Sequence, residues 1–340
     1  MFLCKRFLLT VVSVSWLTTS LFAQKDPPPT PLQLPALSRE KTPAPLTDKS
    51  VTSPAENAQP KTTAANPQPL QLPPGVKAER DLAYVENGHE RQKLDVYLPS
   101  EVKEGAKPLP LIVWIHGGGW TGGNKERPPA VRFVNEGYAV ASINYRLSQH
   151  AIYPAQIEDC KTAIRWLRAN AKKYNFDPEH VGVWGASAGG HLVALLGTTA
   201  EAKELEGKGA NLDQSSRVQC VVDWFGPTDF TVIGDMAENP NSPVCKLLGG
   251  TVKEHKQLAE QASPAKFVNK NSAPFLIQHG DKDPLVPIAQ SEELEEYLKK
   301  AGVEVTLQKI AGAGHGFGNK ESEIAPPIKA FFEKHLKNEK

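Results

Sequence analysis

The chain has 340 residues, and its 39 Lys and Arg side chains nearly balance its 38 Asp and Glu side chains, for a formal net charge of +1. No basic run stands out, which argues against a nucleic-acid partner, because proteins that bind nucleic acids gather Lys and Arg on one face. The length suffices for one large α/β domain with a sizeable hydrophobic core.

Residues 1–23 have the pattern of a secretory signal peptide. Lys5 and Arg6 come first, an apolar stretch from 7 to 22 follows, and we expect cleavage after Ala23. A retained membrane anchor is the alternative, but the stretch is shorter than a typical membrane-spanning helix and is interrupted by Ser and Thr. The pattern therefore predicts a secreted or periplasmic protein with no stable membrane insertion once the signal is removed.

Residues 24–78 differ in composition from the rest of the chain. They are rich in Pro, Ala, Thr, Gln and Lys, and they contain no aromatic residue. Such a segment cannot bury enough apolar surface to offset the entropy lost on ordering. We predict a Pro-rich disordered tether. It contains the repeat Pro-Leu-Gln-Leu-Pro at 31–35 and 69–73, and a specific role of this repeat as a ligand for a partner is the alternative. The folded domain is expected at 79–340.

From residue 79 onward, strand patterns alternate with helix patterns. Apolar runs and period-two alternation predict strands at 82–84, 94–97, 109–115, 138–143, 181–184, 218–225, 274–278 and 303–310. Apolar residues at helical spacing predict helices at 129–136, 154–174, 288–300 and 324–336, and another directly after residue 187. This alternation is typical of an α/β fold with a mostly parallel, doubly wound sheet of about eight strands and helices on both faces. Residues 226–262 show no strong period, and we expect a cap or substrate-binding insertion there.

In such a sheet the functional site lies at the carboxyl ends of the strands, so the loops that follow strands are the place to look for chemistry. One of them is Gly185-Ala186-Ser187-Ala188-Gly189, between an apolar strand and an apolar helix. A serine on a sharp strand-to-helix turn exposes its hydroxyl, and small neighbours avoid clashes there. A turn that only packs the helix on the sheet is the alternative. The context favours Ser187 as a nucleophile.

A second loop, 116–120, has the sequence His-Gly-Gly-Gly-Trp. Consecutive glycines allow backbone N–H groups to converge on one point, as acyl transfer requires for the negative charge on the carbonyl oxygen. We expect Gly117, Gly118 and Ala188 to form this oxyanion hole. A merely flexible loop is the alternative.

Two more loops supply an acid and a base. The loop 281–287 has the sequence Asp-Lys-Asp-Pro-Leu-Val-Pro, and a carboxylate here could orient a histidine. A calcium-binding loop is the alternative, but Leu285 and Val286 occupy the positions where it would need a ligand and a glycine. Of the 9 histidines, only His315 lies in a Gly-rich loop, 312–317, that follows both Ser187 and the acidic loop 281–287 in the chain. Oxyanion loop, serine, acid and histidine then follow one another in the order of an α/β-hydrolase triad.

These stretches, HGGGW, GASAG, HGDKDPLVP and GAGHGF, resemble the α/β-hydrolase superfamily, in particular the esterases related to hormone-sensitive lipase. RQKLDVYLP at 91–99, NYRLS at 144–148, YPAQIEDCKTAIRWLRANA at 153–171 and DWFGPTDF at 223–230 are similar to bacterial secreted esterases, a group that includes bifunctional acetylxylan and feruloyl esterases. The resemblance spans about 79–337 and implies the α/β-hydrolase fold. It also implies Asp283, rather than Asp281, as the partner of His315.

The implied activity is hydrolysis of carboxylic esters through an acyl-enzyme on Ser187, without a metal or an organic cofactor. The implied substrate is a small-molecule or polysaccharide ester, and the sequence names neither the acyl group nor the oligomeric state. Trp120 and Phe317 flank the oxyanion loop and the histidine, so they are candidates for the substrate pocket, with core packing equally open.

Two functions from other classes remain as alternatives. A serine peptidase of the prolyl-oligopeptidase type uses the same triad but usually carries a large additional domain. A non-catalytic binding protein on a hydrolase fold commonly lacks a triad member, whereas all three are present here. Among the cysteines that follow residue 23, Cys160 is expected to be buried, while Cys220 and Cys245 are free to pair; their spacing fits no metal site.

Overall fold

A computed structural model describes residues 71–101 and 105–337 of the chain. The predicted signal peptide at 1–23 and the predicted tether up to residue 70 lie outside the described residues. Within the described part, no helix is long and apolar enough to cross a membrane.

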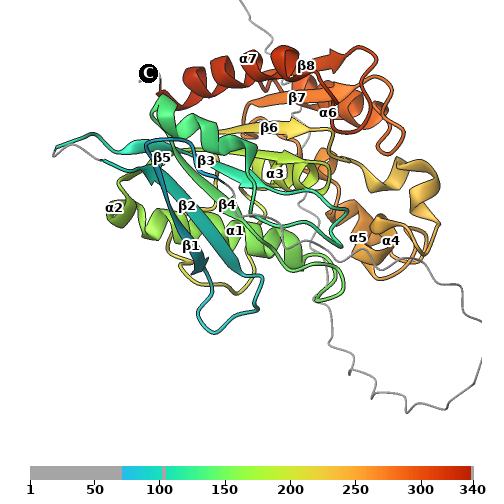
Figure 1. Ribbon diagram of the computed structural model, residues 1–340. Coiled ribbons are helices and arrows are strands. Elements are labelled where there is room, and N and C mark those ends of the chain that lie inside the picture. Colours follow the sequence, from blue (N-terminus) through green and yellow to red (C-terminus); the bar gives the residue numbers. More distant parts are fainter. Residues whose placement is uncertain (1–70, 102–104, 338–340) are drawn as a thin grey trace, which may run out of the picture. The chain divides into compact units, whose positions relative to one another are not determined.

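One eight-stranded sheet forms the centre of the described domain, with the spatial order β1-β2-β4-β3-β5-β6-β7-β8 (Figure 1). The strands are β1 (Val76–Ala83), β2 (Lys93–Pro99), β3 (Leu109–Ile115), β4 (Ala139–Ile143), β5 (Phe176–Ala186), β6 (Cys220–Trp224), β7 (Phe275–Gly280) and β8 (Val305–Ile310). β2 pairs antiparallel with β1 and β4, and all later pairs are parallel. The predicted mostly parallel, doubly wound sheet is confirmed, and the carboxyl ends of β3, β5, β6, β7 and β8 all point to one edge.

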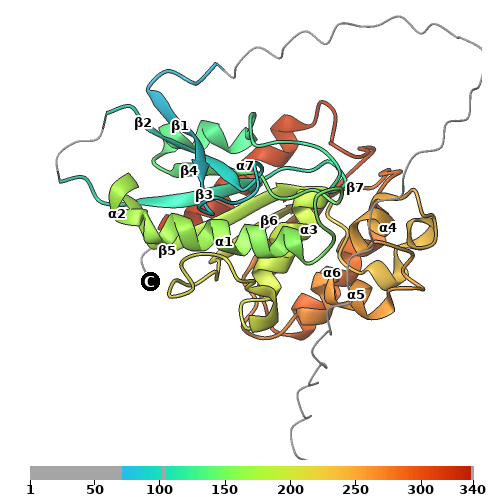
Figure 2. The same ribbon diagram turned by 90° about the horizontal axis from the view of Figure 1, so that it is seen from below.

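Helices cover both faces of this sheet, as predicted. The α-helices are α1 (Ala155–Ala169), α2 (Ala171–Tyr174), α3 (Ala188–Thr198), α4 (Pro243–Leu248), α5 (Lys256–Gln261), α6 (Ala289–Lys300) and α7 (Glu321–Phe332). A 3-10 helix, η1 (Pro129–Glu136), and a π-helical turn, η6 (Glu333–Lys337), complete the covering layers. Figures 1 and 2 show α1 and α7 on opposite sides of the sheet.

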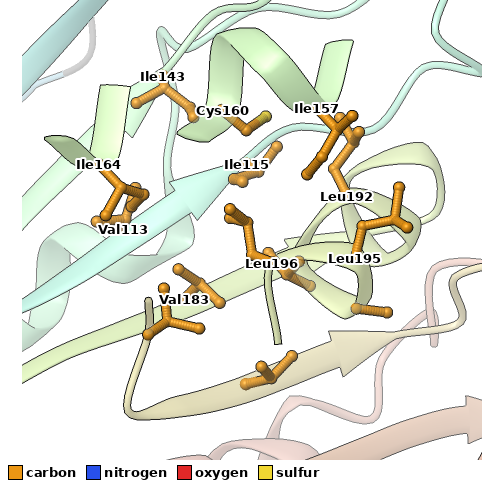
Figure 3. Close-up of a cluster of buried hydrophobic side chains, with 14 of the residues drawn as sticks. Val113, Ile115, Ile143, Ile157, Cys160, Ile164, Val183, Leu192, Leu195 and Leu196 are labelled. Atoms are coloured by element: carbon orange, nitrogen blue, oxygen red, sulfur yellow. The ribbon is translucent and has the colours of Figure 1, made fainter. Parts of the chain in front are cut away.

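The period-two pattern of β3 explains how one strand serves two cores. Leu111, Val113 and Ile115 are buried against residues of α1 and α3, and Figure 3 shows Val113 and Ile115 among side chains from these helices. The intervening residues Ile112 and Trp114 are buried on the other face, with residues of η1 and α7. Burying each such side chain contributes about 1.5–3 kcal/mol, so a one-residue slip of the strand would be costly.

The predicted start of the folded domain at residue 79 is wrong. β1 begins at Val76, and Leu72 already packs against the core on the side of the sheet that η1 and α7 cover. The Pro-rich stretch ends in a turn that contains Pro73 and Gly75, in which the N–H of Val76 donates to the carbonyl oxygen of Pro73. The strand begins directly after this turn. The low apolar content of this segment concealed a strand that is held mainly by backbone pairing with β2.

The three cysteines in the described residues are buried and free, so Cys220 and Cys245 do not pair. Cys220 lies in β6, where it contributes to the core on the side of α7. Cys245 lies in α4, within the region 226–262 that the sequence marks as an insertion. This region forms α4, α5 and short 3-10 turns, which lie together beside the carboxyl ends of the strands (Figure 2).

Candidate active site

Ser187 occupies a strained turn between β5 and α3. Its backbone has φ +55° and ψ −119°, a conformation that L-residues rarely adopt and that costs about 1–3 kcal/mol. The turn is tight because a Cβ on Gly185 would stand 2.3 Å from the carbonyl oxygen of Gly189, and one on Gly189 would stand 2.1 Å from that of Ile115. Both glycines of the pentapeptide are therefore required by close backbone packing, and they place Ser187 at the edge where the strands end.

The loop after β3 brings Gly117 and Gly118 next to this turn. A Cβ on Gly117 would lie 2.7 Å from the carbonyl oxygen of Ala186, and Gly118 has φ +110°. Among the described residues, the N–H groups of Gly117, Gly118 and Ala188 donate to no protein acceptor. Ala188 is the first residue of α3, where N–H groups have no intrahelical partner. Three residues with free N–H groups thus line the same cavity as Ser187.

An interaction that sequence reasoning missed fixes the start of this loop. The Arg91 side chain donates to Nε2 of His116 at 3.1 Å and to the carbonyl oxygens of Gly123 and Tyr145 at 2.9 Å each. Nδ1 of His116 donates to the carbonyl oxygen of Gly117 at 2.7 Å, which leaves Nε2 as the acceptor. Burial lowers the pKa of His116 to about 4, so this imidazole stays neutral and the loop stays anchored near pH 7. Only the resemblance of 91–99 to secreted esterases pointed to this arginine.

His315, in the loop after β8, lies against Asp283, in the loop after β7. Nδ1 of His315 donates to Oδ2 of Asp283 at 2.7 Å, and the Asp283 side chain is fully buried. Backbone N–H groups of Leu285 and Val286 donate to Oδ1 at 2.8 and 3.0 Å. Burial opposes ionisation of this carboxyl, but hydrogen bonds from His279, His315 and the two N–H groups outweigh it and hold its pKa well below the ordinary value.

Asp281 has a different task in the same loop. Its Oδ1 accepts a hydrogen bond from the backbone N–H of Gly312 at 2.7 Å, so it ties the loop after β7 to the loop after β8. The structure therefore pairs His315 with Asp283 and not with Asp281. Because Nδ1 of His315 carries the proton that Asp283 accepts, its Nε2 has the free lone pair that a general base needs.

Ser187 and His315 open onto the same cavity of about 790 Å³, whose lining is mostly apolar. The described side chains of Ser187 and His315 do not form a hydrogen bond with each other. In serine hydrolases this bond is often long in the free enzyme and shortens when substrate binds. Gly117, Gly118 and Ala188 also line the cavity, and Met236, Asn239 and Val244 of the insertion 226–262 form part of its wall. Another cavity, of about 580 Å³, lies near Gln219 and Pro274, where β6 and β7 begin, and thus away from these residues.

The two candidates for the substrate pocket have different surroundings. Trp120 lines the cavity and stacks edge-on against His191 and Phe230, with ring centroids 5.1 and 5.6 Å apart. For Phe317 the structure supports core packing, the alternative that the sequence left open, because its ring is buried against Phe225 and Trp224 and does not line the cavity.

Phe225, which the sequence did not single out, takes the position expected for Phe317. It lines the cavity, and its ring centroid lies 4.4 Å from that of His315. It directly follows β6 and has φ +43°, so a strained turn directs it toward the histidine. The only sequence signal for it was its place in the DWFGPTDF stretch.

One cluster among the described residues has the composition of a metal site. His89, Glu90 and His150 each offer a ligand atom within 4.8 Å of the others. Nδ1 of His89 accepts from the N–H of Arg91, and Nδ1 of His150 accepts from the N–H of Leu147. In the neutral rings Nε2 then carries the proton, so neither lone pair is free to bind a metal. The cluster does not line the cavity onto which Ser187 opens.

A parallel sheet, a serine on the turn after its central strand, and an acid and a histidine after two later strands together define an α/β hydrolase. Comparison with known proteins identifies the group. The model of the BD-FAE family matches residues 94–298, and the chain belongs to this family.

Among curated proteins, the chain is similar to esterase LipC of Mycobacterium tuberculosis, with 33% identity over 268 residues. The alignment covers 74% of this chain and 64% of LipC, so the chain spans less than two thirds of that relative. Among solved structures, a truncated carbohydrate esterase from gut microbiota is 35% identical, with a TM-score of 0.72 over 77% of this chain and 97% of that one. An acetyl ester-xyloside bifunctional hydrolase from Caldicellulosiruptor lactoaceticus is 29% identical, with a TM-score of 0.59 over 72% of this chain and 86% of the other.

Proposed function

We propose that the protein is a serine esterase that hydrolyses carboxylic esters through Ser187, His315 and Asp283. One observation carries the proposal: His315, which is bonded to Asp283, lines the same cavity as Ser187 and the three residues with free N–H groups. The esterases among its relatives support the same reaction.

In the proposed mechanism, His315 removes the proton from Ser187 as the hydroxyl oxygen attacks the ester carbonyl. The N–H groups of Gly117, Gly118 and Ala188 donate to the oxyanion that forms, and a preorganised donor of this kind is worth about 10²–10³ in kcat. Asp283 keeps the proton of His315 on Nδ1 and stabilises the imidazolium. His315 then protonates the leaving alcohol, and water, activated by the same imidazole, releases the acid from Ser187.

We further propose that the protein acts outside the cytoplasm on acyl groups of a carbohydrate, in line with the signal-like pattern at 1–23. The carbohydrate esterase and the acetyl ester-xyloside hydrolase among its structural relatives support the substrate class. The cavity adds support, because two asparagines, Asn239 and Asn241, line its otherwise mostly apolar wall, and polar residues in an apolar pocket can bond a sugar hydroxyl.

The substrate is tested with a panel of acetyl, butyryl, longer acyl and feruloyl esters, each on a simple alcohol and on a sugar. We expect the highest kcat/KM for a short acyl or feruloyl group on a sugar. A clear preference for long acyl chains would contradict the carbohydrate proposal. A Pro-containing peptide in the same panel tests for a peptidase, and failure of a fluorophosphonate to label Ser187 would favour a binding protein.

A further inference from the structure

A second histidine, His279, contacts the acid of the proposed triad. It lies in β7, and both its side chain and that of Asp283 are fully buried. Its Nε2 lies 3.3 Å from Oδ2 of Asp283 and 3.0 Å from the carbonyl oxygen of Val286, and its Nδ1 lies 2.7 Å from Oγ of Ser291. The oxygen that accepts from His315 therefore also faces the ring of His279.

The neighbours of His279 decide where its proton is. Carbonyl and carboxylate oxygens only accept hydrogen bonds, so Nε2 must carry a proton and donate toward Val286 and Asp283. In the neutral ring Nδ1 is then an acceptor, and the Ser291 hydroxyl, which lies in α6 and is fully buried, donates to it. Ser291 thus stabilises the tautomer of His279 that serves Asp283.

We propose that His279 is a positioning residue that sets the basicity of His315 by donating a second hydrogen bond to Asp283. The proposal rests on the esterase function proposed above. A second donor on Oδ2 reduces the negative charge that Oδ2 presents to Nδ1 of His315. Asp283 therefore stabilises the imidazolium of His315 less than it would if His315 were its only side-chain donor. His315 therefore remains deprotonated, and able to act as a base, at a lower pH.

Backbone hydrogen bonds hold Asp283 in place without His279, so the electrostatic role of His279 can be tested separately from a role in positioning Asp283. Oδ1 accepts from the N–H groups of Leu285 and Val286, so the carboxylate retains two anchors when His279 is removed. Besides Asp283, and His315 beyond it, the titratable group that acts on His279 from a neighbouring element is Asp223, at the end of β6. Burial raises the pKa of Asp223 to about 6, so its titration must be separated from that of His315.

The test is the pH dependence of kcat/KM for a short nitrophenyl ester, measured for the wild type, His279→Leu and His279→Gln. Leucine removes the donor, whereas the glutamine amide can donate to Asp283 and accept from Ser291. We expect the acidic limb of the His279→Leu profile to move to higher pH by at least ~0.5 pH units, with kcat at its optimum reduced more than KM is changed. The His279→Gln profile should return toward that of the wild type.

Two controls isolate the effect. His180→Gln makes the same change in a half-exposed histidine that bonds Asp177 at 2.8 Å beside the other cavity, and its profile should match the wild type. Asp223→Asn removes the neighbouring titration, and the shift caused by His279→Leu should persist in that background. If His279→Leu does not fold, Ser291→Ala replaces it, with a smaller shift expected in the same direction.

An unshifted or lowered acidic limb in His279→Leu, or equal shifts in the Leu and Gln variants, would overturn the proposal. If the His279→Leu variant does not fold, an unshifted acidic limb in the profile of Ser291→Ala would likewise overturn the proposal. Loss of turnover in Ser187→Ala, together with unshifted His279 variants, would leave the esterase mechanism standing and remove only the role of His279. Normal turnover in Ser187→Ala would instead remove the proposed function itself.

Discussion

Replacing Asp283 with asparagine tests the acid that the structure pairs with His315. Oδ2 of Asp283 accepts from Nδ1 of His315 at 2.7 Å, whereas Oδ1 already accepts from two backbone N–H groups. An asparagine at this position can keep its oxygen on those N–H groups only by turning its NH₂ group toward His315. That NH₂ group is a donor, so Nδ1 must become an acceptor and the proton must move to Nε2.

A proton on Nε2 removes the lone pair that accepts the Ser187 proton. Loss of the productive tautomer lowers kcat by about 10⁴-fold in a serine triad, which corresponds to about 5.5 kcal/mol of transition-state stabilisation. We expect a fall of this order for Asp283→Asn with little change in KM, measured with a short nitrophenyl ester at about pH 8.

Asp281→Asn is the matched control, because it makes the same change two positions away in the same loop. Its Oδ1 accepts only from the N–H of Gly312, a bond that an asparagine oxygen preserves. We expect turnover within about threefold of the wild type, as is usual where no buried charge or catalytic bond is lost. If Asp281→Asn proved the more damaging of the two, the assignment of the acid to Asp283 would be refuted.

Two further predictions concern the framework of the site. Burial raises the pKa of Asp223 from its ordinary 3.8 to about 6, so the folded state holds this proton more tightly than the unfolded state does. The free energy of unfolding should therefore fall as pH rises from about 4 to above about 6, by an amount on the order of 3 kcal/mol. Urea unfolding of Asp223→Asn should lack this component, and an identical pH dependence in variant and wild type would rule the prediction out. Gly117→Ala should lower kcat by about 10²–10³-fold, because the new Cβ would stand 2.7 Å from the carbonyl oxygen of Ala186 and displace an oxyanion donor. Gly122→Ala, whose Cβ would meet its nearest atom at 3.9 Å, is the control in the same loop, and comparable kcat losses in both would argue against an oxyanion role for Gly117.

The sequence predicted the sheet well because buried parallel strands are continuous apolar runs, as in Leu109–Ile115, and such runs have few alternative structures. It also located the loops of the site, since Gly185 and Gly189 stand where any side chain would clash with backbone. The clash at Gly185 is with nearby Gly189, whereas the clash at Gly189 is with Ile115 of the neighbouring strand, and each requirement leaves a glycine that can be read from the sequence.

The misses concern contacts between segments far apart in sequence. Phe225 and Phe317 are both aromatic residues beside glycines, and only the three-dimensional packing decides that Phe225 faces the cavity while Phe317 lies beneath it. The contact between Arg91 and His116 joins a hairpin to the loop after β3, so no local pattern could reveal it. The contact of His279 with Asp283 depends on how the loop after β7 folds back, so it too left no local pattern.

The central claim is that Ser187 forms the acyl-enzyme, and the kcat of Ser187→Ala tests it most directly. The substitution removes one oxygen atom and leaves the oxyanion donors Gly117, Gly118 and Ala188 in place. With the thermal unfolding midpoint unchanged, we expect turnover of a short nitrophenyl ester to fall by about 10⁴-fold or more. Near-normal turnover by the folded variant would contradict the account.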